Sequence, residues 1–438
     1  MYAGFDIGTT KVCAVVVDGK GETVYSESFP NGYENPSSGP EKTQDAERIV
    51  EGCADIYRNI QKKYRVESVG ISTQMHGILY YGADGKALSP LFTWQDGRGN
   101  LPFRGKTYAG ILKEASGYDA ASGYGSVSVF FDALNGLIPP GAKGICTVGD
   151  YLAMKLTGNT EALVHATNGA SIGLYKTSAG VFDVVAAEKA GLPSGLFPRC
   201  VSECETVGYA KGGAAVACCI GDNQASIYGA LKDPEDAALN VGTGSQISVV
   251  TDKTVAPGGC EIRPFFNGKN LLIGCPLCGG YAYELLKRFF ESVTGGTVPY
   301  DVMNEWAESA MGKNVPVTAT CFNGTRENPF LRASISELDS ENFNAPALAY
   351  SVLKGMSGEL AGCYEKIKQS DGRRKNLIGT GNAVRKNRAL RKIICEDFGM
   401  KLLIPQHTEE AAYGAALLAA ESCCGKSLKR FIKYSDGC

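Results

Sequence analysis

Residues 5–18 of this 438-residue chain are FDIGTTKVCAVVVD, and residues 239–252 repeat the pattern as LNVGTGSQISVVTD, at an offset of 234. Each copy is typical of an apolar strand, a tight Gly-Thr turn and a second strand rich in β-branched residues. A hairpin that recurs half a chain later predicts two domains built on one plan. We place the boundary at residue 232, in the polar stretch KDPED, and expect domains 1–232 and 233–438.

The turns of both hairpins have the chemistry of a phosphate site. Glycine lets backbone N–H groups approach an anion, and threonine hydroxyls add further donors. Two such hairpins facing each other could hold a polyphosphate from both sides. Asp6 of the first copy is Asn240 in the second, so only the first copy offers a carboxylate to Mg²⁺. A single Gly-Thr turn would more often just join two strands, but duplication makes this alternative weaker.

Composition excludes several classes of protein. Lysine plus arginine total 44 against 46 acidic residues, which leaves no electrostatic footprint for nucleic acid or an anionic membrane. Hydrophobic residues make up 44%, as in folded proteins, yet no apolar run approaches the ~20 residues of a membrane span. The N-terminus has no secretory signal, so we expect a cytoplasmic location.

The 16 cysteines do not look like a disulfide framework. Two adjacent pairs occur at 218–219 and 423–424, while Cys13 and Cys395 lie inside apolar periodic segments. We interpret most of them as small buried hydrophobes. Cys275 and Cys278 form a C-x-x-C without a second ligand pair, so packing is favoured over a metal site.

Helical and strand patterns alternate along the chain. In 45–62 one helical face carries Ile49, Val50, Cys53, Ile56, Tyr57 and Ile60, and Val66 to Ser72 follows as a buried strand. In the second half a strand at 377–378 leads to a helix with Val384, Leu390, Ile393 and Ile394 facing inward, then a strand at 402–404 and an alanine-rich helix at 409–421. This alternation predicts α/β domains, with the last dozen residues peripheral.

Two polar segments suit a sugar. Residues 72–77, STQMHG, follow the predicted buried strand at its carboxyl end, where open α/β sheets bind ligands. Residues 93–98, TWQDGR, combine an aromatic ring with an acid, an amide and a guanidinium. Such groups bind hydroxyls and cover the C–H face of a sugar. The alternatives are that Trp94 anchors a core, that Asp96 and Arg98 form a local ion pair, and that His76 is structural.

Residues 221–226, GDNQAS, are expected to begin a helix between the two hairpins. Asp222 could simply cap that helix. Its position between the phosphate loops favours another role, because phosphoryl transfer to a hydroxyl needs a base that receives the proton. The helix dipole would keep this carboxylate ionised.

These motifs, together with GTGNA at 379–383, resemble the FGGY carbohydrate kinases in order and spacing. Within that family they are most similar to the sedoheptulokinases, on TWQDGR, on GYG at 123–125 leading to Phe130, on NGAS at 168–171, and on GDNQAS. The resemblance runs from residue 4 to about residue 421. It implies an actin-like ATPase fold, in which two α/β ribonuclease-H-like domains surround a central cleft.

The resemblance also implies roles for particular residues, with ATP and Mg²⁺ as the cofactors. Asp222 would be the catalytic base and Asp6 would help to hold Mg²⁺. The implied sugar-binding residues are Gln74, Met75, His76, Trp94, Asp96, Phe130, Asp222 and Asn223. The implied ATP-binding residues are Thr9, Thr10, Lys11, Gly242, Thr243, Gly280, Glu284, Gly381, Asn382 and Lys386.

The expected activity is phosphorylation of a ketose at a terminal primary hydroxyl, with sedoheptulose as the first choice. Xylulose, or another ketose or polyol of the same family, is the alternative. A non-catalytic actin-like nucleotide switch or sugar sensor is the alternative from a different class. We expect a sugar as the partner, no nucleic acid or membrane, and a monomer or homodimer.

Overall fold

The computed structural model describes residues 1–438 except 36–38, 243 and 326–327. It divides into two compact units, and each is described by itself. Unit 1 comprises Met1–Gly229, Pro264–Gly268 and His407–Ile432, and unit 2 comprises Ala230–Arg263, Lys269–Gln406 and Lys433–Cys438. Among the described residues, no helix combines the length and apolar character that a bilayer span requires.

Unit 1 is built on a mixed sheet. Its strands lie in the order β15 (Thr206–Tyr209), β16 (Ala215–Ala217), β5 (Ser68–Thr73), β1 (Tyr2–Ile7), β2 (Lys11–Val17) and β3 (Thr23–Pro30), with β17 (Ile220–Gly221) also paired to β5. β1 and β17 both run parallel to β5, one on each side of it. Three parallel strands therefore end next to one another at one edge of this sheet.

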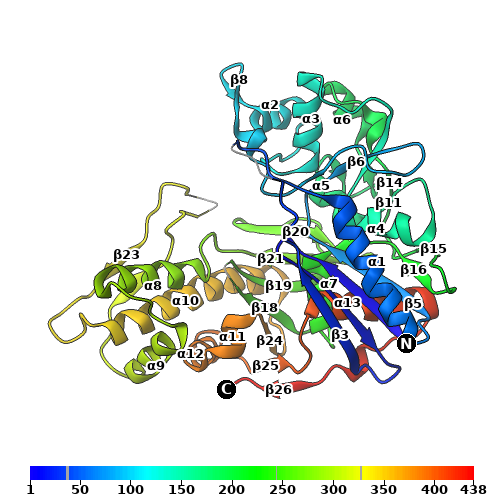
Figure 1. Ribbon diagram of the computed structural model, residues 1–438. Helices are drawn as coiled ribbons and strands as arrows, with labels where there is room; N and C mark the ends of the chain where they lie inside the picture. The colour runs from blue at the N-terminus through cyan, green and yellow to red at the C-terminus, as the bar shows by residue number, and fades with distance from the viewer. Residues whose placement is uncertain (36–38, 243, 326–327) are drawn as a thin grey trace. The chain divides into compact units, whose positions relative to one another are not determined.

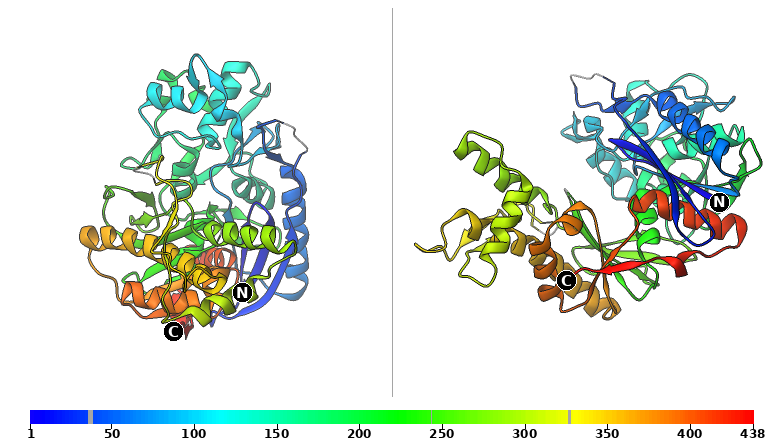
Figure 2. Two further views of the ribbon diagram at one scale, coloured as in Figure 1. Left: turned by 90° about the vertical axis from the view of Figure 1, so that its left-hand side faces the viewer. Right: turned by 60° about the horizontal axis from the view of Figure 1, so that its bottom comes forward.

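A C-terminal helix, α13 (Glu410–Cys424), covers one face of this sheet (Figure 1). Close approach depends on glycine: a Cβ on Gly4 of β1 would lie 1.9 Å from the carbonyl oxygen of Ala412, and one on Gly70 of β5 would lie 2.0 Å from that of Ala415. The two further views show the same red helix against the blue strands (Figure 2). A helix from near the C-terminus therefore packs against strands from the N-terminal part of the chain.

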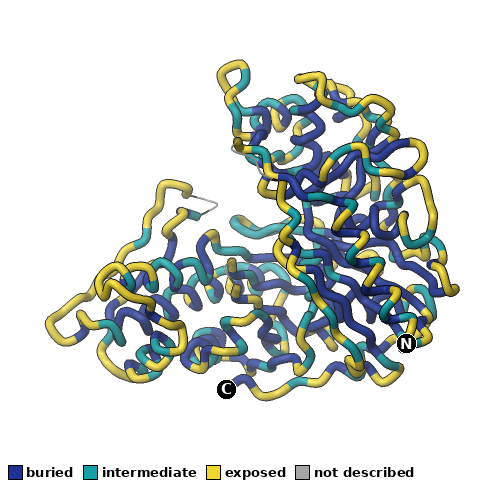
Figure 3. Tube along the Cα trace, in the orientation of Figure 1, coloured by how far each residue is buried: buried dark blue, intermediate teal, exposed yellow. Residues whose placement is uncertain are grey.

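The predicted helix of 45–62 is α1 (Ala46–Lys63), and all six residues expected on its inner face are buried. Figure 3 shows that the middle of this sheet is buried, where β1 and β5 lie. The other helices of unit 1 are α2 (Tyr108–Ser116), α3 (Gly125–Asn135), α4 (Val148–Thr157), α5 (Ala166–Ile172), α6 (Val184–Lys189) and α7 (Asp222–Ala230). Short strand pairs accompany them: β4 (Thr43–Gln44) with β7 (Leu91–Phe92), β6 (Leu79–Gly82) with β10 (Ala142–Cys146), and β11 (Leu163–His165) with β14 (Arg199–Val201).

Unit 2 has a second sheet of similar plan. Its strands lie in the order β20 (Cys260–Pro264), β21 (Asn270–Gly274), β19 (Ser245–Thr251), β18 (Ala237–Val241), β24 (Leu377–Thr380), β25 (Leu402–Pro405) and β26 (Tyr434–Asp436). Its helices are α8 (Tyr281–Thr294), α9 (Tyr300–Ala310), α10 (Ala345–Asp371), α11 (Asn382–Lys386) and α12 (Arg388–Phe398). Residues of these helices and of β18, β19 and β24 share one hydrophobic core.

The duplicated hairpin is present in both units, but its two copies differ by one residue in register. Ala3 pairs with Val16 in the first copy, whereas the equivalent Ala237 pairs with Val249 in the second. The turn explains the difference: Gly8 donates to the carbonyl of Lys11, and Gly242 donates to the carbonyl of Gly244, one position earlier. The second strands therefore match at an offset of 233, although the sequence alone favoured 234.

Two expectations for the second half were wrong. The single helix expected after residue 381 is divided into α11 and α12, because the side chain of Asn387 accepts from the N–H of Leu390 and begins a new helix. The last residues are not peripheral, since β26 extends the second sheet. There Cys438 forms a disulfide bond with Cys395 of α12, so Cys395 is not the free hydrophobe we expected.

Candidate functional site

The parallel strands of unit 1 bring three predicted site residues to one edge. Asp6 pairs with Ser72 across β1 and β5, and Ile220 pairs with Ser72 from the other side. Gln74 directly follows β5, and Asp222 directly follows β17. The carboxyl ends of parallel strands meet at the same edge of a sheet, which is where α/β proteins bind ligands. This edge is the candidate active site of unit 1.

The carbonyl groups of the turn 8–11 in the first hairpin are fixed by hydrogen bonds from two other residues. Asn31 donates from Nδ2 to the carbonyl of Gly8 at 2.8 Å and from its backbone N–H to the carbonyl of Thr10 at 2.9 Å. Gln44 donates from Nε2 to the carbonyl of Thr9 at 2.8 Å. In a trans peptide the next N–H points opposite to the carbonyl, so the N–H groups of Thr9 and Thr10 face the other way. This arrangement suits an anion such as a phosphate.

Asp6 is the carboxylate of this edge. Ser72 donates a hydrogen bond of 2.7 Å to its Oδ1. Burial raises the pKa of Asp6 to about 6, the bond from Ser72 opposes that rise, and the charge of Glu409 adds to it. Lys11 does not contact Asp6 directly, because both carboxylate oxygens of Glu409 bind its Nζ at 2.7 Å.

The donor set fits a magnesium ion that is shared with a nucleotide. Among the described residues, no group of three or more acidic, histidine or cysteine side chains forms a metal cage. Mg²⁺ in nucleotide sites typically uses one or two carboxylates and completes its shell with phosphate oxygens and water. Asp6, beside the turn 8–11, offers one such carboxylate.

Four side chains join the turn to the predicted sugar residues. Trp94 donates from Nε1 to Thr9 Oγ1 at 2.9 Å, and Thr9 Oγ1 donates to Gln74 Oε1 at 3.2 Å. Gln74 donates from Nε2 to Gln44 Oε1 at 2.9 Å. We call these four residues the Gln44 circuit. Trp94 is 48% exposed, so a ligand can reach this residue.

The neighbouring Met75 and His76 adopt fixed positions. His76 has a φ of 73°, an unusual value for a residue with a side chain, and such strain is found mainly where the surrounding structure holds it. His76 makes two hydrogen bonds to Ser171. Its backbone N–H donates to Ser171 Oγ, and its Nδ1 donates to the Ser171 carbonyl at 2.7 Å. The His76 ring stacks on Tyr124 at 4.6 Å. Met75 is buried against Gly221, so it lies next to the start of α7.

Asp222 is the first residue of α7. The N–H of Asn223 donates to Asp222 Oδ1 at 2.7 Å, and the N–H of Gly221 donates to Thr167 Oγ1 at 3.0 Å. Near this point the side-chain oxygens of Thr73, Asn168 and Asn223 are buried and accept no hydrogen bond within the described residues. Unpaired buried polar atoms are costly, and they are common where a ligand or water completes the site.

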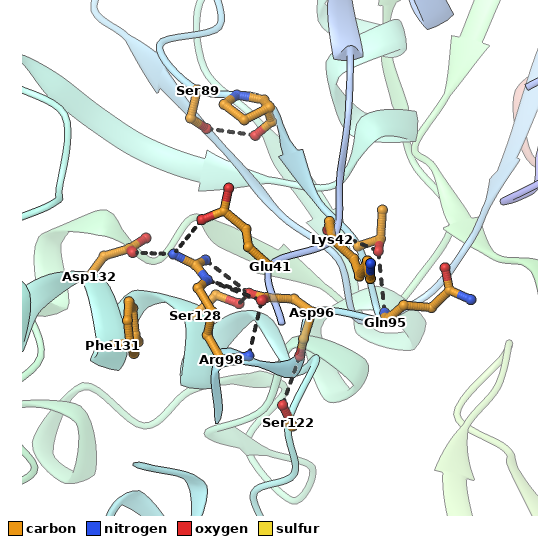
Figure 4. Close-up of polar contacts among 12 residues, drawn as sticks. Glu41, Lys42, Ser89, Gln95, Asp96, Arg98, Ser122, Ser128, Phe131 and Asp132 are labelled. Carbon is orange, nitrogen blue, oxygen red and sulfur yellow. Dashed lines mark hydrogen bonds and ion pairs between the residues drawn. The ribbon is translucent and has the colours of Figure 1, made fainter. Parts of the chain in front are cut away.

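Asp96 lies in the local ion pair with Arg98 that the sequence left open as an alternative. Its carboxylate accepts from Arg98 Nε and NH2 and from Ser128 Oγ, and Arg98 NH1 also binds Asp132 at 2.9 Å (Figure 4). Asp96 is only 2% exposed. The local ion pair is therefore present, and sugar contact by Asp96 stays a prediction. Phe130 is similarly buried, edge-on to Tyr108 in a hydrophobic cluster.

In unit 2 most of the predicted nucleotide residues line one cavity of about 550 Å³. They are Gly242, Gly280, Glu284, Gly381, Asn382 and Lys386. Position 381 requires glycine, because its φ is 85° and a Cβ there would lie 2.6 Å from the carbonyl oxygen of Val241. Thr243, the remaining predicted residue of this unit, lies outside the described residues.

Sequence reasoning missed several residues at both sites. In unit 1 these are Asn31, Gln44, Ser72 and Glu409; in the cavity of unit 2 they are Asn240, Tyr283, Tyr300, Asp301, Asn304 and Asn387. Asn304 accepts from Asn387 Nδ2 at 2.7 Å, which fixes both amides at the cavity wall. Two of them carried a sequence signal: Asn240 is the counterpart of Asp6, and Ser72 begins the polar segment 72–77.

Comparison with known proteins identifies the family. The N-terminal domain of the FGGY family of carbohydrate kinases matches residues 1–104, and the C-terminal domain of that family matches residues 239–423. A sedoheptulokinase from Mus musculus is 27% identical over an alignment 477 positions long, which covers 95% of this chain and 96% of that protein.

Solved structures of similar proteins confirm the predicted fold. A xylulose kinase from Rhodospirillum rubrum superposes with a TM-score of 0.85 at 16% identity, over 99% of this chain and 93% of that one. A glycerol kinase from Plasmodium falciparum, solved with ADP, gives a TM-score of 0.82 at 17% identity, over 98% and 92%. The fold is the actin-like ATPase fold with ribonuclease-H-like α/β domains.

Proposed function

Since the chain belongs to the FGGY family of carbohydrate kinases, we propose that it transfers the γ-phosphoryl group of ATP to the terminal primary hydroxyl of a ketose, sedoheptulose first among them. The observation that carries the proposal is the shared strand edge of unit 1. There the phosphate-type turn, Gln74 and Asp222 follow three adjacent parallel strands. The near full-length similarity to a sedoheptulokinase supports the choice of sugar.

In this proposal Asp222 accepts the proton of the attacking hydroxyl. The N–H of Asn223 holds one carboxylate oxygen, and the start of α7 favours the ionised form. A base placed within reach of the hydroxyl lowers the barrier as the new P–O bond forms. Gln74, Met75, His76, Trp94 and Asn223 would bind the sugar, whereas Asp96 would act indirectly by holding Arg98.

The phosphates would bind the N–H groups of Thr9 and Thr10 and the side chain of Lys11. Lys11 would exchange Glu409 for a phosphate oxygen, a change that the flexible lysine stem permits. Asp6 would hold Mg²⁺, which would offset charge on the β- and γ-phosphates. The cavity of unit 2, with Glu284, Asn382 and Lys386, would take the nucleoside.

A panel of ketoses tests this proposal. ADP release is measured for sedoheptulose, xylulose and related ketoses and polyols, and the phosphorylated position is identified by ³¹P NMR. We expect sedoheptulose to give the highest kcat/KM, and a higher value for xylulose would overturn the choice of sugar. Asp222→Asn should lower kcat by several orders of magnitude while ATP binding survives, whereas Asp55→Asn, an exposed change on α1, should be neutral. If no sugar raises ADP release, the nucleotide-switch alternative is favoured.

A further inference from the structure

The Gln44 circuit has only one arrangement of its protons. Its two ends are fixed by chemistry: the indole Nε1 of Trp94 can only donate, and the carbonyl of Thr9 can only accept. Thr9 Oγ1 accepts from Trp94 and so gives its own proton to Gln74 Oε1. Gln74 Nε2 then donates to Gln44 Oε1, and Gln44 Nε2 donates to the carbonyl of Thr9.

This arrangement limits what each member can offer to a ligand. The Thr9 hydroxyl proton is committed to Gln74, so a phosphate would meet the backbone N–H of Thr9 and not its hydroxyl. Gln74 uses one N–H for Gln44 and one lone pair of Oε1 for Thr9, so its second N–H and its second lone pair are what it can present to a ligand. Gln44 is 1% exposed and makes no contribution of its own at the surface.

We propose that Gln44 is the positioning residue that couples the phosphate turn to the sugar side of the site. It binds the backbone of Thr9 with one end of its amide and fixes the orientation of Gln74 with the other end. The inference rests on the proposed function, because it assigns sugar contact to Gln74 and Trp94. A side chain that could not both donate and accept would release one side or the other.

Gln44→Glu tests this directly. An ionised carboxylate can still accept from Gln74, but it meets the carbonyl of Thr9 without a proton. A protonated carboxyl group restores the donor, and burial beside a carbonyl should raise the pKa of the introduced group above the ordinary glutamate value. We therefore expect kcat/KM for the sugar to fall about tenfold or more near pH 8 and to recover to within about threefold of wild type near pH 5.5.

Matched variants separate this from a general structural effect. Gln44→Leu should fall by a similar factor and show no recovery at lower pH. Gln369→Glu, an exposed change on α10, should follow wild type throughout. Each variant is compared with wild type at the same pH, because Asp6 titrates nearby. Activity of Gln44→Glu equal to wild type near pH 8, or equal loss in both Gln44 variants at every pH, would overturn the proposal.

A second readout does not depend on activity. The chain has two tryptophans, so Trp306→Phe isolates the fluorescence of Trp94. In that background Gln44→Glu should shift the Trp94 emission as the pH rises through the pKa of the introduced group, whereas Gln44→Leu should give a constant spectrum. A pH-independent Trp94 spectrum for Gln44→Glu would contradict the circuit. If wild type phosphorylates no ketose, the proposed function fails, but the fluorescence result still decides the circuit.

Discussion

Ser72 donates a hydrogen bond of 2.7 Å to Asp6 from the next parallel strand, and this bond opposes the effect of burial on the pKa of that carboxylate. Burial raises the pKa of Asp6 to about 6. In the unfolded chain the same group would titrate near 4. The folded protein therefore carries a cost for ionised Asp6 above about pH 6, and the cost disappears below about pH 4.

Asp6→Asn removes this cost. We expect the variant to have a higher Tm than wild type near pH 8 and no advantage near pH 4, while ATP-dependent sugar phosphorylation is lost. Thermal unfolding across this pH range without added Mg²⁺ measures the difference, with Asp55→Asn as the exposed control. A Tm difference that stays constant with pH would contradict the assigned environment of Asp6.

Gly414→Ala should move the proposed base. A Cβ at this position in α13 would lie 1.9 Å from the carbonyl oxygen of Ala225 in α7. Because this oxygen belongs to the backbone, the helices themselves would have to move apart. We expect a loss of about 1–3 kcal/mol in unfolding free energy. Because α7 begins at Asp222, kcat should also fall.

Gly358→Ala on α10 is the matched control for that change, since nothing lies within 4 Å of its added Cβ. It should be neutral or stabilise by up to about 1 kcal/mol through helix propensity. Denaturant unfolding and steady-state kinetics of both variants make the comparison. Equal stability of the two variants would show that α7 and α13 do not depend on this close approach.

Arg98→Met should be strongly destabilising. Arg98 is the cation for two buried carboxylates, Asp96 and Asp132, and burial already raises the pKa of Asp132. Removing one partner of a buried pair costs about 3–5 kcal/mol, because a charge is left uncompensated. The loss should shrink as the pH is lowered and Asp132 becomes protonated.

Lys86→Met is the corresponding surface control, as its ion pair with Asp84 is largely exposed. We expect a change of less than about 1 kcal/mol. Chemical denaturation near pH 7.5 and near pH 5 measures both variants. A loss for Arg98→Met that does not depend on pH would argue against the charge explanation.

Lys386→Met should weaken nucleotide binding. Lys386 lines the cavity of unit 2, and a charge-assisted hydrogen bond to phosphate is worth about 1.5–3 kcal/mol, or roughly tenfold or more in Kd. Isothermal titration with ATP measures the loss, and Lys368→Met, outside this cavity, serves as the control. Unchanged ATP affinity would remove Lys386 from the proposed site.

The elements that local pattern controls could be predicted well. The inner face of α1 follows from helical periodicity, and the paired strands of each hairpin follow from apolar runs that flank a Gly-Thr turn. The strand end that carries Gln74 and the helix start at Asp222 were also placed correctly. The register of the second hairpin was not predicted correctly. The length of a hairpin turn depends on which carbonyl accepts from the N–H of its glycine, and this differs between the two copies.

The sequence by itself determined the family, the α/β plan and the residue types at the strand edge, since these depend on periodicity and on short motifs. Only the tertiary structure decided the partners of those residues. In the structure Asp96 accepts hydrogen bonds from Arg98 and Ser128, and α13 packs against the first sheet. Asn31 and Gln44 bind the carbonyl groups of the phosphate turn. Hydrogen bonds between segments far apart in the sequence depend on how the whole chain packs, so they cannot be predicted from local sequence patterns.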